Sequence, residues 1–398
     1  MRSLLLLFIF IGLSMAAAHK IRLRKKETLR MKLIREGKWE EYHTRKQLRK
    51  MLGNTTNFIG HKQAVLYDTG SANFWVPDND CREDCSDPEC QARFNCEILC
   101  PIEECCYGGR APPCEVADRF QSSRSRTYQK DGRTLGINYG FGTFYGFLGN
   151  DQVTLASDDV PLVIPKVTFA QATSVTPAFE GNEFEGIIGL AFPSVAVDQI
   201  VPPFFEAINQ GLVDQQLFTV FLEHSDEEGG EGGFITFGGL DTDNCGEALV
   251  YSTLTSQTYF IFKMAGISVG TYANNKGWEV ALDTSSSFIA GPSDIVKSIT
   301  RTLGATYDGD YGLYTVPCNT QLPNITLTIE GVQLPIESNN YVDELQTHAG
   351  RLCVLAVSER DATGFQPEFI LGNPFNRQYC HIYDIGGKRA GFAAHNNN

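Results

Sequence analysis

Two stretches of the chain hold an aspartate between apolar residues. The first reads Val-Leu-Tyr-Asp-Thr-Gly-Ser around Asp68, and the second reads Val-Ala-Leu-Asp-Thr-Ser-Ser around Asp283. Hydroxyl groups and turn amides beside such an aspartate can donate hydrogen bonds to its carboxylate, while the apolar neighbours hold it in place. One Asp-Thr-Gly alone is also typical of an ordinary Asx turn. Its repetition within one chain is what indicates chemistry.

A second pair of matching segments lies downstream of the two aspartates. An apolar pair followed by glycine occurs as Ile187-Ile188-Gly189 in the first half and as Ile370-Leu371-Gly372 in the second. This predicts a two-copy chain in which each copy contributes one carboxylate. Two carboxylates within hydrogen-bond reach share one proton, because both cannot ionise cheaply. The ionised member can then take a proton from water, and the protonated member can donate a hydrogen bond.

These motifs resemble those of the pepsin and cathepsin D family of aspartic proteases. Residues 184–193 are also similar to the floor of the family's first lobe, and residues 369–379 to its C-terminal signature. The resemblance covers almost all of the chain after residue 60. It implies a mainly β, bilobal fold in which two pseudo-symmetric β lobes enclose a central cleft. It also implies an aspartic endopeptidase that cleaves peptide bonds between bulky apolar residues at acidic pH.

The resemblance further implies the residues of the site. Asp68 and Asp283 are the expected catalytic pair. The other expected residues support the two loops (Thr69, Gly70, Ser71, Thr284, Ser285 and Ser286) or form the substrate-covering flap with the tryptophan beneath it (Tyr139, Gly140, Phe141, Gly142 and Trp75).

Three kinds of contact are expected within this set. The hydroxyl groups of Ser71 and Ser286 should each hydrogen-bond the neighbouring aspartate. The side chains of Thr69 and Thr284 should tie the two loops together. At the flap, the Tyr139 hydroxyl should reach the indole N–H of tryptophan 75.

Ser285 departs from the family, whose members have glycine at this position. If the position requires a backbone open to glycine alone, a Cβ would strain the loop or displace Asp283. The alternative function is therefore a catalytically impaired pepsin-like protein that binds peptides or ligands in the same cleft.

The segment before the first aspartate also departs from the family. Relatives carry a Tyr-x-Gly-x-Ile-x-Ile-Gly-Thr-Pro strand there, whereas this chain has only a shorter stretch over residues 51–63. Either the gene model is incomplete or the first lobe is rebuilt. In both cases a strand near Asp68 is expected to lack a sheet neighbour, and its backbone groups need other partners.

The N-terminal region predicts a secretory precursor. Arg2, an apolar run and three alanines before residue 19 are typical of a signal peptide, which directs the product to secretion or to the lysosome. The predicted order is a signal peptide (1–18), a basic propeptide (19–50), an N-terminal β lobe (51–232) with a Cys-rich insertion (81–114) and a flap (135–155), an acidic crossing between the lobes (225–233), and a C-terminal β lobe (233–398).

Charge divides the precursor into a basic head and an acidic body. Residues 19–50 hold 13 Lys/Arg against 4 Asp/Glu, whereas residues 51–398 carry a net charge of −24. A solvated basic helix or a nucleic-acid patch is the alternative explanation, which the secretory route disfavours. We expect instead that the propeptide is an intramolecular inhibitor, and that acidification loosens it by protonating its carboxylate partners.

Cysteines indicate a disulfide-bonded protein. Eight of the 12 cysteines lie within residues 81–114. Zinc is the competing explanation, but no histidine lies among them and the compartment is oxidising. The family resemblance implies a disulfide between Cys318 and Cys353, which leaves Cys245 with Cys380. The insertion is reminiscent of those in nematode and plant relatives, and the resemblance is closest to the nematode branch.

The remaining sequence features concern metals, cofactors, partners and glycosylation. The seven histidines show no metal-ligand spacing, and no phosphate-binding loop occurs, so no metal and no cofactor are expected. The expected partners are protein and peptide substrates, with no nucleic acid and no membrane, and the expected state is a monomer. Asn54 and Asn324 begin glycosylation sequons.

Overall fold

The computed structural model describes residues 18–26, 29–39, 57–58, 65–83, 114, 119–139, 142–157, 160–176, 185–223, 231–347, 350–360 and 366–396. Several predicted features lie outside these ranges: signal-peptide residues 1–17, Asn54, most of the Cys-rich insertion, Gly140 and Phe141. Within the described ranges, no helix is long and apolar enough to cross a membrane.

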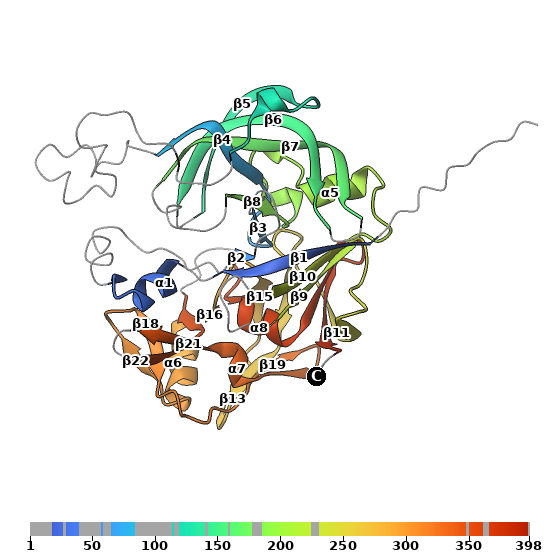
Figure 1. Cartoon of the computed structure of the whole chain (residues 1–398). Coiled ribbons are helices and arrows are strands. Elements are labelled where there is room, and N and C mark those ends of the chain that lie inside the picture. The colour runs from blue at the N-terminus through green and yellow to red at the C-terminus, as the bar shows by residue number, and fades with distance from the viewer. Residues whose placement is uncertain are drawn as a thin grey trace, which may run out of the picture.

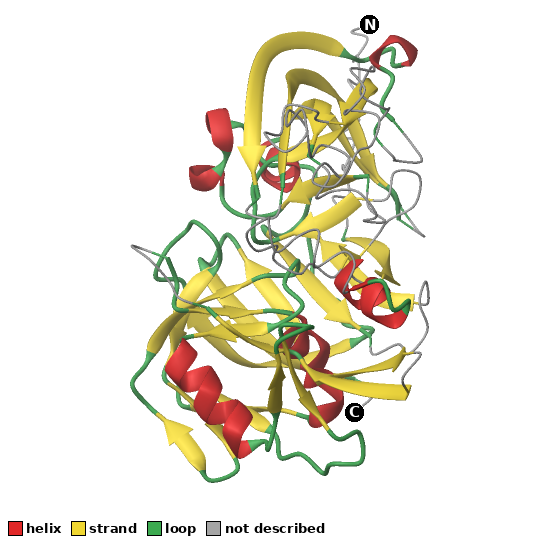
Figure 2. Cartoon of the chain, turned by 90° about the vertical axis from the view of Figure 1, so that its left-hand side faces the viewer, coloured by secondary structure: helices red, strands yellow, loops and turns green. Residues whose placement is uncertain are grey.

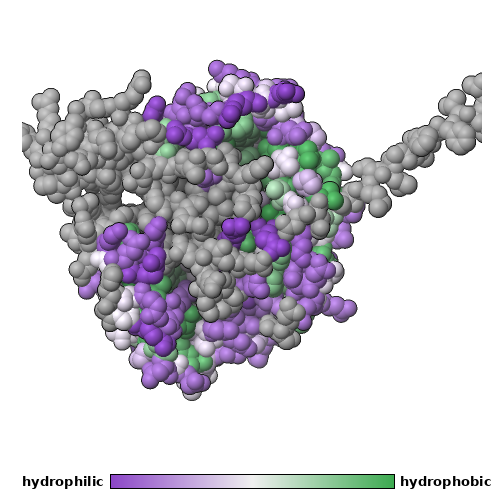
Figure 3. Space-filling model, viewed as in Figure 1, coloured by the Kyte–Doolittle hydropathy of each residue, from purple (hydrophilic) through white to green (hydrophobic). Residues whose placement is uncertain are grey.

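The chain forms two β lobes that meet at a shared sheet (Figure 1). One lobe lies above this sheet in the view and the other below it, and the helices α6 to α8 belong to the lower lobe, as the turned view also shows (Figure 2). The described surface on this face is largely hydrophilic (Figure 3). The predicted mainly β, bilobal fold is therefore confirmed.

The shared sheet has seven strands from distant parts of the chain. Strand β9 pairs with β10 on one side and with β25 on the other, and all six of its residues are buried. In sheet order the strands are β11 (Cys245–Thr253), β26 (Arg389–His395), β25 (Cys380–Asp384), β9 (Leu217–Leu222), β10 (Glu231–Phe237), β1 (His19–Lys26) and β2 (Asn57–Phe58).

The N-terminal lobe is built on a six-stranded sheet. Its order is β3 (Val65–Asp68), β8 (Gly186–Gly189), β4 (Phe74–Glu83), β7 (Leu162–Val175), β6 (Thr143–Leu155) and β5 (Gln129–Asn138). Strands β5 and β6 form an antiparallel hairpin whose tip falls at residues 139–142, where the flap is predicted. The short helix α5 (Pro203–Asn209) packs against β7.

The C-terminal lobe combines three sheets with three helices. The first sheet contains β12 (Ile261–Met264), β15 (Trp278–Leu282), β24 (Phe369–Leu371), β16 (Ile289–Gly291) and β23 (Val357–Glu359). The second contains β14 (Tyr272–Asn274), β13 (Gly266–Val269), β19 (Ile325–Ile329) and β20 (Val332–Ile336), and the third β17 (Thr306–Asp308), β18 (Leu313–Val316), β22 (Gly350–Leu355) and β21 (Val342–Thr347). The helices are α6 (Ser293–Thr302), α7 (Ser338–Tyr341) and α8 (Asn373–Gln378).

Both lobes repeat one arrangement around their aspartates. Strand β3 runs parallel to β8, and β4 runs antiparallel to it. In the second lobe β15 likewise runs parallel to β24, and β16 runs antiparallel to it. A Cβ on Gly189 would lie 2.3 Å from the carbonyl carbon of Ala72, and one on Gly372 would lie 2.3 Å from the carbonyl oxygen of Ser286. Only glycine permits this close approach. The predicted two-copy chain is confirmed.

The predicted crossing between the lobes at residues 225–233 stays a prediction. The strands on either side of residues 224–230, β9 and β10, pair with each other in register from Phe218↔Phe237 to Leu222↔Gly233. Both strands belong to the shared sheet, and so does β11, which follows residues 238–244. An acidic, glycine-rich composition is typical of any exposed connection, and it could not distinguish a hairpin from a crossing.

Strand β3 lies at the edge of its sheet, as the shortened segment before Asp68 predicts. Beside it is a cavity of about 280 Å³, lined mainly by apolar side chains that include Val65, Tyr67, Phe74 and Phe169. The cavity thus lies directly against the strand that ends at the first aspartate.

The structure contains three disulfides among its described cysteines: Cys245–Cys380, Cys318–Cys353 and Cys81–Cys114. The first joins the start of β11 to the start of β25 in the shared sheet. The third closes the base of the Cys-rich insertion, which supports disulfides over zinc for that pair. The other pairings of the insertion lie outside the described residues.

His381 is fully buried in β25, near the centre of the shared sheet. Its ring packs against Phe375 at a centroid distance of 4.7 Å and against Phe392 at 5.1 Å. Burial, with a smaller contribution from His395, lowers the pKa of His381 to about 3. The folded chain therefore keeps this imidazole neutral, whereas the unfolded chain protonates it below about pH 6.5.

Replacement of His381 by phenylalanine should increase stability in acid. The stability that neutral His381 provides is complete above pH 6.5 and is lost as the pH falls toward 3, at about 1.4 kcal/mol per pH unit. Urea unfolding between pH 7 and pH 4, measured in an Asp68→Asn background so that the chain cannot process itself, should show a growing advantage for His381→Phe. An advantage that is constant with pH would contradict the prediction.

Candidate active site

The first aspartate sits at the end of an apolar strand, on a turn that supplies hydrogen-bond donors. Asp68 is the last residue of β3 and is 4% exposed. The amide of Gly70 donates to its Oδ1 at 2.7 Å, and the hydroxyl of Ser71 donates to its Oδ2 at 2.6 Å. Each carboxylate oxygen thus accepts one bond from the loop, as predicted for Ser71.

The second loop is similar in backbone and different in its side-chain contacts. Asp283 directly follows β15, and the amide of Ser285 donates to its Oδ1 at 2.8 Å. The hydroxyl of Ser285 donates to the same oxygen at 2.7 Å. The prediction that the Ser286 hydroxyl bonds Asp283 is wrong, because this hydroxyl donates instead to the carbonyl oxygen of Phe288 at 3.2 Å.

Two buried threonines join the loops as predicted. The amide of Thr69 donates to Oγ1 of Thr284 at 3.1 Å, and the amide of Thr284 donates to Oγ1 of Thr69 at 3.0 Å. Each hydroxyl then donates across the interface to a strand carbonyl, Thr69 to Leu282 at 3.0 Å and Thr284 to Tyr67 at 2.7 Å. Four hydrogen bonds, here called the threonine clasp, therefore hold the ends of β3 and β15 together.

This clasp brings the two carboxyl groups into one site. A Cβ on Gly70 would lie only 2.9 Å from Oδ2 of Asp283, so glycine leaves the space that the second carboxyl group occupies. Burial, and then the charge of Asp283, raise the pKa of Asp68 to about 7 against hydrogen bonds from Ser71, Gly70 and Ser285. Burial also raises the pKa of Asp283, against hydrogen bonds from Ser285. The pair is therefore suited to sharing one proton.

Tyr139, which directly follows β5, lies close to the first aspartate. Burial, followed by the charge of Asp68, raises the pKa of Tyr139. Trp75 in turn stacks on Phe144 of β6, with ring centroids 4.7 Å apart. Tyr139 packs against the apolar cluster that contains Trp75 and Phe144, so it connects the hairpin to the first loop. The hydrogen bond between its hydroxyl and the Trp75 indole stays a prediction. Gly142 accepts a bond from the Tyr139 amide at 2.8 Å.

Three further residues near the pair were not identified from the sequence. Burial and the charge of Asp68 raise the pKa of Tyr259, and the pKa of Tyr383 is raised mainly by burial and also by Asp283. The charge of Arg360, which follows β23, partly offsets the rise that burial causes in the pKa of Asp283. None of the three belongs to a motif that occurs twice in the chain, so no sequence signal could have distinguished them.

Metal binding has no support among the described side chains. The only group of metal-type ligands within mutual reach there is Cys318, Glu344 and Cys353. The two cysteines form a disulfide and cannot act as thiolate ligands. Asn324 is exposed just before β19, where glycosylation stays a prediction.

Loss of the Thr69 hydroxyl should destabilise the fold and the site together. Thr69→Val leaves the Thr284 amide and the Leu282 carbonyl without their partners in a buried interface, at a cost of about 2–4 kcal/mol. Thr69→Ser keeps the hydroxyl and is the matched control. Urea unfolding should separate the two variants clearly, and equal stabilities would refute the importance of the clasp.

Comparison with known proteins agrees with this geometry. The family model for eukaryotic aspartyl proteases matches residues 58–395. Aspartic protease 6 of Caenorhabditis elegans is 36% identical over 420 aligned residues, and aspartic protease 2 of Necator americanus is 36% identical over 429; each alignment covers 99% of both chains. Cathepsin E of Mus musculus is 28% identical over 98% of this chain and 97% of its own.

The alignment with the C. elegans relative is longer than this 398-residue chain, so at least 22 of its positions have no residue here. A pair of buried, clasped aspartates on pseudo-symmetric β lobes, together with these matches, shows that the chain belongs to the eukaryotic aspartyl protease family, whose enzymes are aspartic-type endopeptidases.

Proposed function

We propose that this chain is the zymogen of a secreted or lysosomal endopeptidase that uses Asp68 and Asp283 to hydrolyse proteins at acidic pH. The observation that carries the proposal is the threonine clasp, which holds two buried carboxyl groups in one site with raised pKa values. Such a pair keeps a single proton over an acidic pH range, which is the state that the reaction requires.

The reaction follows from that single proton. The ionised carboxylate removes a proton from a water molecule, whose oxygen attacks the carbonyl carbon of the scissile peptide bond. The protonated carboxyl group donates to the carbonyl oxygen as negative charge develops there. A proton then passes to the peptide nitrogen, the C–N bond breaks, and an acid and an amine leave. The hairpin at Tyr139 excludes bulk water from this site.

Replacement of either aspartate should abolish the activity. Asp68→Asn and Asp283→Asn each remove an ionisable group of the pair, and we expect acid hydrolysis of denatured globin to fall by about 10²–10⁴-fold. Pepstatin should inhibit the wild-type protein at the same pH. Undiminished cleavage by either variant would assign the activity to other residues or to a contaminating protease.

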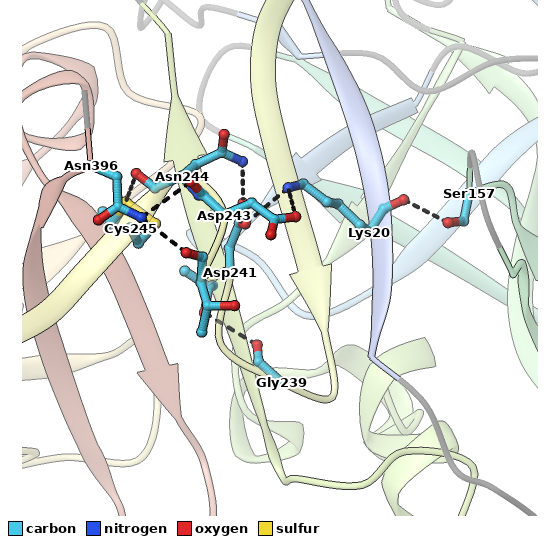
Figure 4. Close-up of polar contacts among 11 residues, drawn as sticks. Lys20, Ser157, Gly239, Asp241, Asp243, Asn244, Cys245 and Asn396 are labelled. Atoms are coloured by element: carbon cyan, nitrogen blue, oxygen red, sulfur yellow. Dashed lines mark hydrogen bonds and ion pairs between the residues drawn. A yellow bond between two sulfur atoms is a disulfide. The ribbon is translucent and has the colours of Figure 1, made fainter.

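The basic N-terminal segment supports the proposal that the chain is a zymogen. Strand β1 pairs along β10 in the shared sheet, and its Ile21 and Leu23 are buried. Lys20 of this strand binds Asp241 at 2.9 Å and Asp243 at 3.1 Å, while the hydroxyl of Ser157 donates to the Lys20 carbonyl at 2.7 Å (Figure 4). Basic side chains thus meet carboxylates of the acidic body.

Helix α1 (Leu29–Arg35) extends the same segment onto the C-terminal lobe. Met31, Ile34 and Trp39 pack in one apolar cluster with Phe288, which lies two residues beyond the Ser286 of the second loop. The Trp39 indole also donates to the Asp310 carbonyl at 2.8 Å. The segment is therefore held by ion pairs at one end and by apolar contacts near the active site at the other.

Removal of the Lys20 charge should allow activation at higher pH. Lys20→Met removes the ion pairs with Asp241 and Asp243, so the segment should be held less tightly and the pH of half-conversion should rise by about half a unit. Gel analysis of the purified precursor after incubation across a pH series measures this directly. Arg133→Met is the control, because it removes only the exposed local pair with Asp131. Identical conversion curves for wild type and Lys20→Met would contradict this role.

The second candidate function is a catalytically impaired protein that binds peptides in the same cleft. Ser285, where relatives have glycine, and the shortened segment before Asp68 favour it. A folded, acid-treated protein that binds pepstatin weakly and cleaves nothing would support this candidate. Cleavage that depends on Asp283 would exclude it.

A further inference from the structure

Ser285 occupies the position that faces the opposite carboxyl group. Gly70 is its counterpart in the first loop, and a Cβ there would lie 2.9 Å from Oδ2 of Asp283 and 3.0 Å from both its Cγ and Oδ1. Because the two loops are related by the repeat, the third residue of each loop points toward the carboxyl group of the other. In the second loop this place holds a hydroxymethyl group, which is also a hydrogen-bond neighbour of Asp68.

The loop accommodates this serine without backbone strain. Ser285 is 8% exposed, and it is not among the described residues with positive φ, so the position does not require glycine for its conformation. Its amide and hydroxyl converge on Oδ1 of Asp283 at 2.8 and 2.7 Å. The feature that suggests an impaired enzyme is thus an additional hydrogen-bond donor to one member of the pair.

The two carboxyl groups consequently have different donor sets. In Asp68 the Gly70 amide and the Ser71 hydroxyl donate to different oxygens, Oδ1 and Oδ2, and Ser285 is a further hydrogen-bond neighbour. In Asp283 both donors of Ser285 bind Oδ1, while Ser286, the counterpart of Ser71, directs its hydroxyl to a backbone carbonyl. Donors stabilise the ionised form of a carboxyl group, and the charge-assisted bonds are the strong ones.

We propose that Ser285 is a positioning residue whose hydroxyl stabilises the ionised form of the carboxyl pair and thereby extends the activity of the site to lower pH. Its amide and its hydroxyl both donate to Oδ1 of Asp283. This inference rests on the proposed function, because it concerns the protonation of the same pair.

The groups around the pair allow a pH profile to test the inference. Besides the two aspartates, the titratable and charged side chains that face them within the described chain are Tyr139, Tyr259, Tyr383 and Arg360. The tyrosines stay neutral and the arginine stays charged throughout the acid range. A change in the acid limb of the profile therefore reports the carboxyl pair.

The test is the pH dependence of kcat/KM for the matured enzyme on a quenched fluorescent peptide, compared among wild type, Ser285→Ala, Ser285→Gly and Ser286→Ala. Loss of the Ser285 hydroxyl should raise the pKa of the acid limb by about one unit in both Ser285 variants. Ser286→Ala should keep the wild-type acid limb. Ser285→Gly gives the second loop the Asp-Thr-Gly sequence of the first loop, so this variant is expected to fold.

A purely structural role for Ser285 predicts something different. It would lower kcat/KM by the same factor at every pH and leave the acid limb in place, and that result would overturn the inference. An acid limb that shifts equally in Ser286→Ala would overturn it as well.

A second measurement separates this inference from the proposed function. If wild-type protein cleaves nothing, the proposed function fails, but the carboxyl pair still titrates. The stability difference between wild type and Ser285→Ala in urea should then grow as the pH rises from 3 to 7, because the hydroxyl stabilises only the ionised form of the carboxyl pair. A difference that is constant with pH would overturn the inference.

Discussion

The close approach of two carboxyl groups inside a buried interface is the constraint on which this structure depends. Charge repulsion and desolvation both oppose it, and they are offset only if donors and backbone hold the groups in place. The clasp between Thr69 and Thr284 provides the position, and the turn amides of Gly70 and Ser285 provide the donors. The two lobes are thus joined at the point where their chemistry takes place.

The shared sheet also joins the two lobes, at a distance from the active site. It contains strands from the N-terminal segment, the middle of the chain and the C-terminus, and a disulfide between Cys245 and Cys380 joins two of them. Because β1 belongs to this sheet, the basic segment is bound by backbone pairing as well as by charge. Under the proposed activation, release of this segment would remove a strand from the sheet that joins the two lobes.

Comparison of the two repeated aspartate loops also shows where the lobes differ. Both aspartate loops follow the same strand order, yet their side chains distribute hydrogen bonds differently, since Ser285 bonds Asp283 while Ser286 turns to a carbonyl. A symmetric backbone thus supports an asymmetric pair of acids. Such asymmetry suits a reaction in which one carboxyl group must accept a proton while the other retains one.

The sequence by itself determined the repeated Asp-Thr motifs, the glycines that close backbone contacts require, the hairpin that ends at residues 139–142 and the mainly β fold, because each depends on local residue types or on their recurrence. Tertiary structure alone decided which serine hydroxyl reaches Asp283, that the strands on either side of residues 224–230 pair with each other, and that Tyr259, Tyr383 and Arg360 lie near the pair. These features depend on how distant segments pack, and a side chain's neighbours across an interface leave no periodic or local trace in the chain.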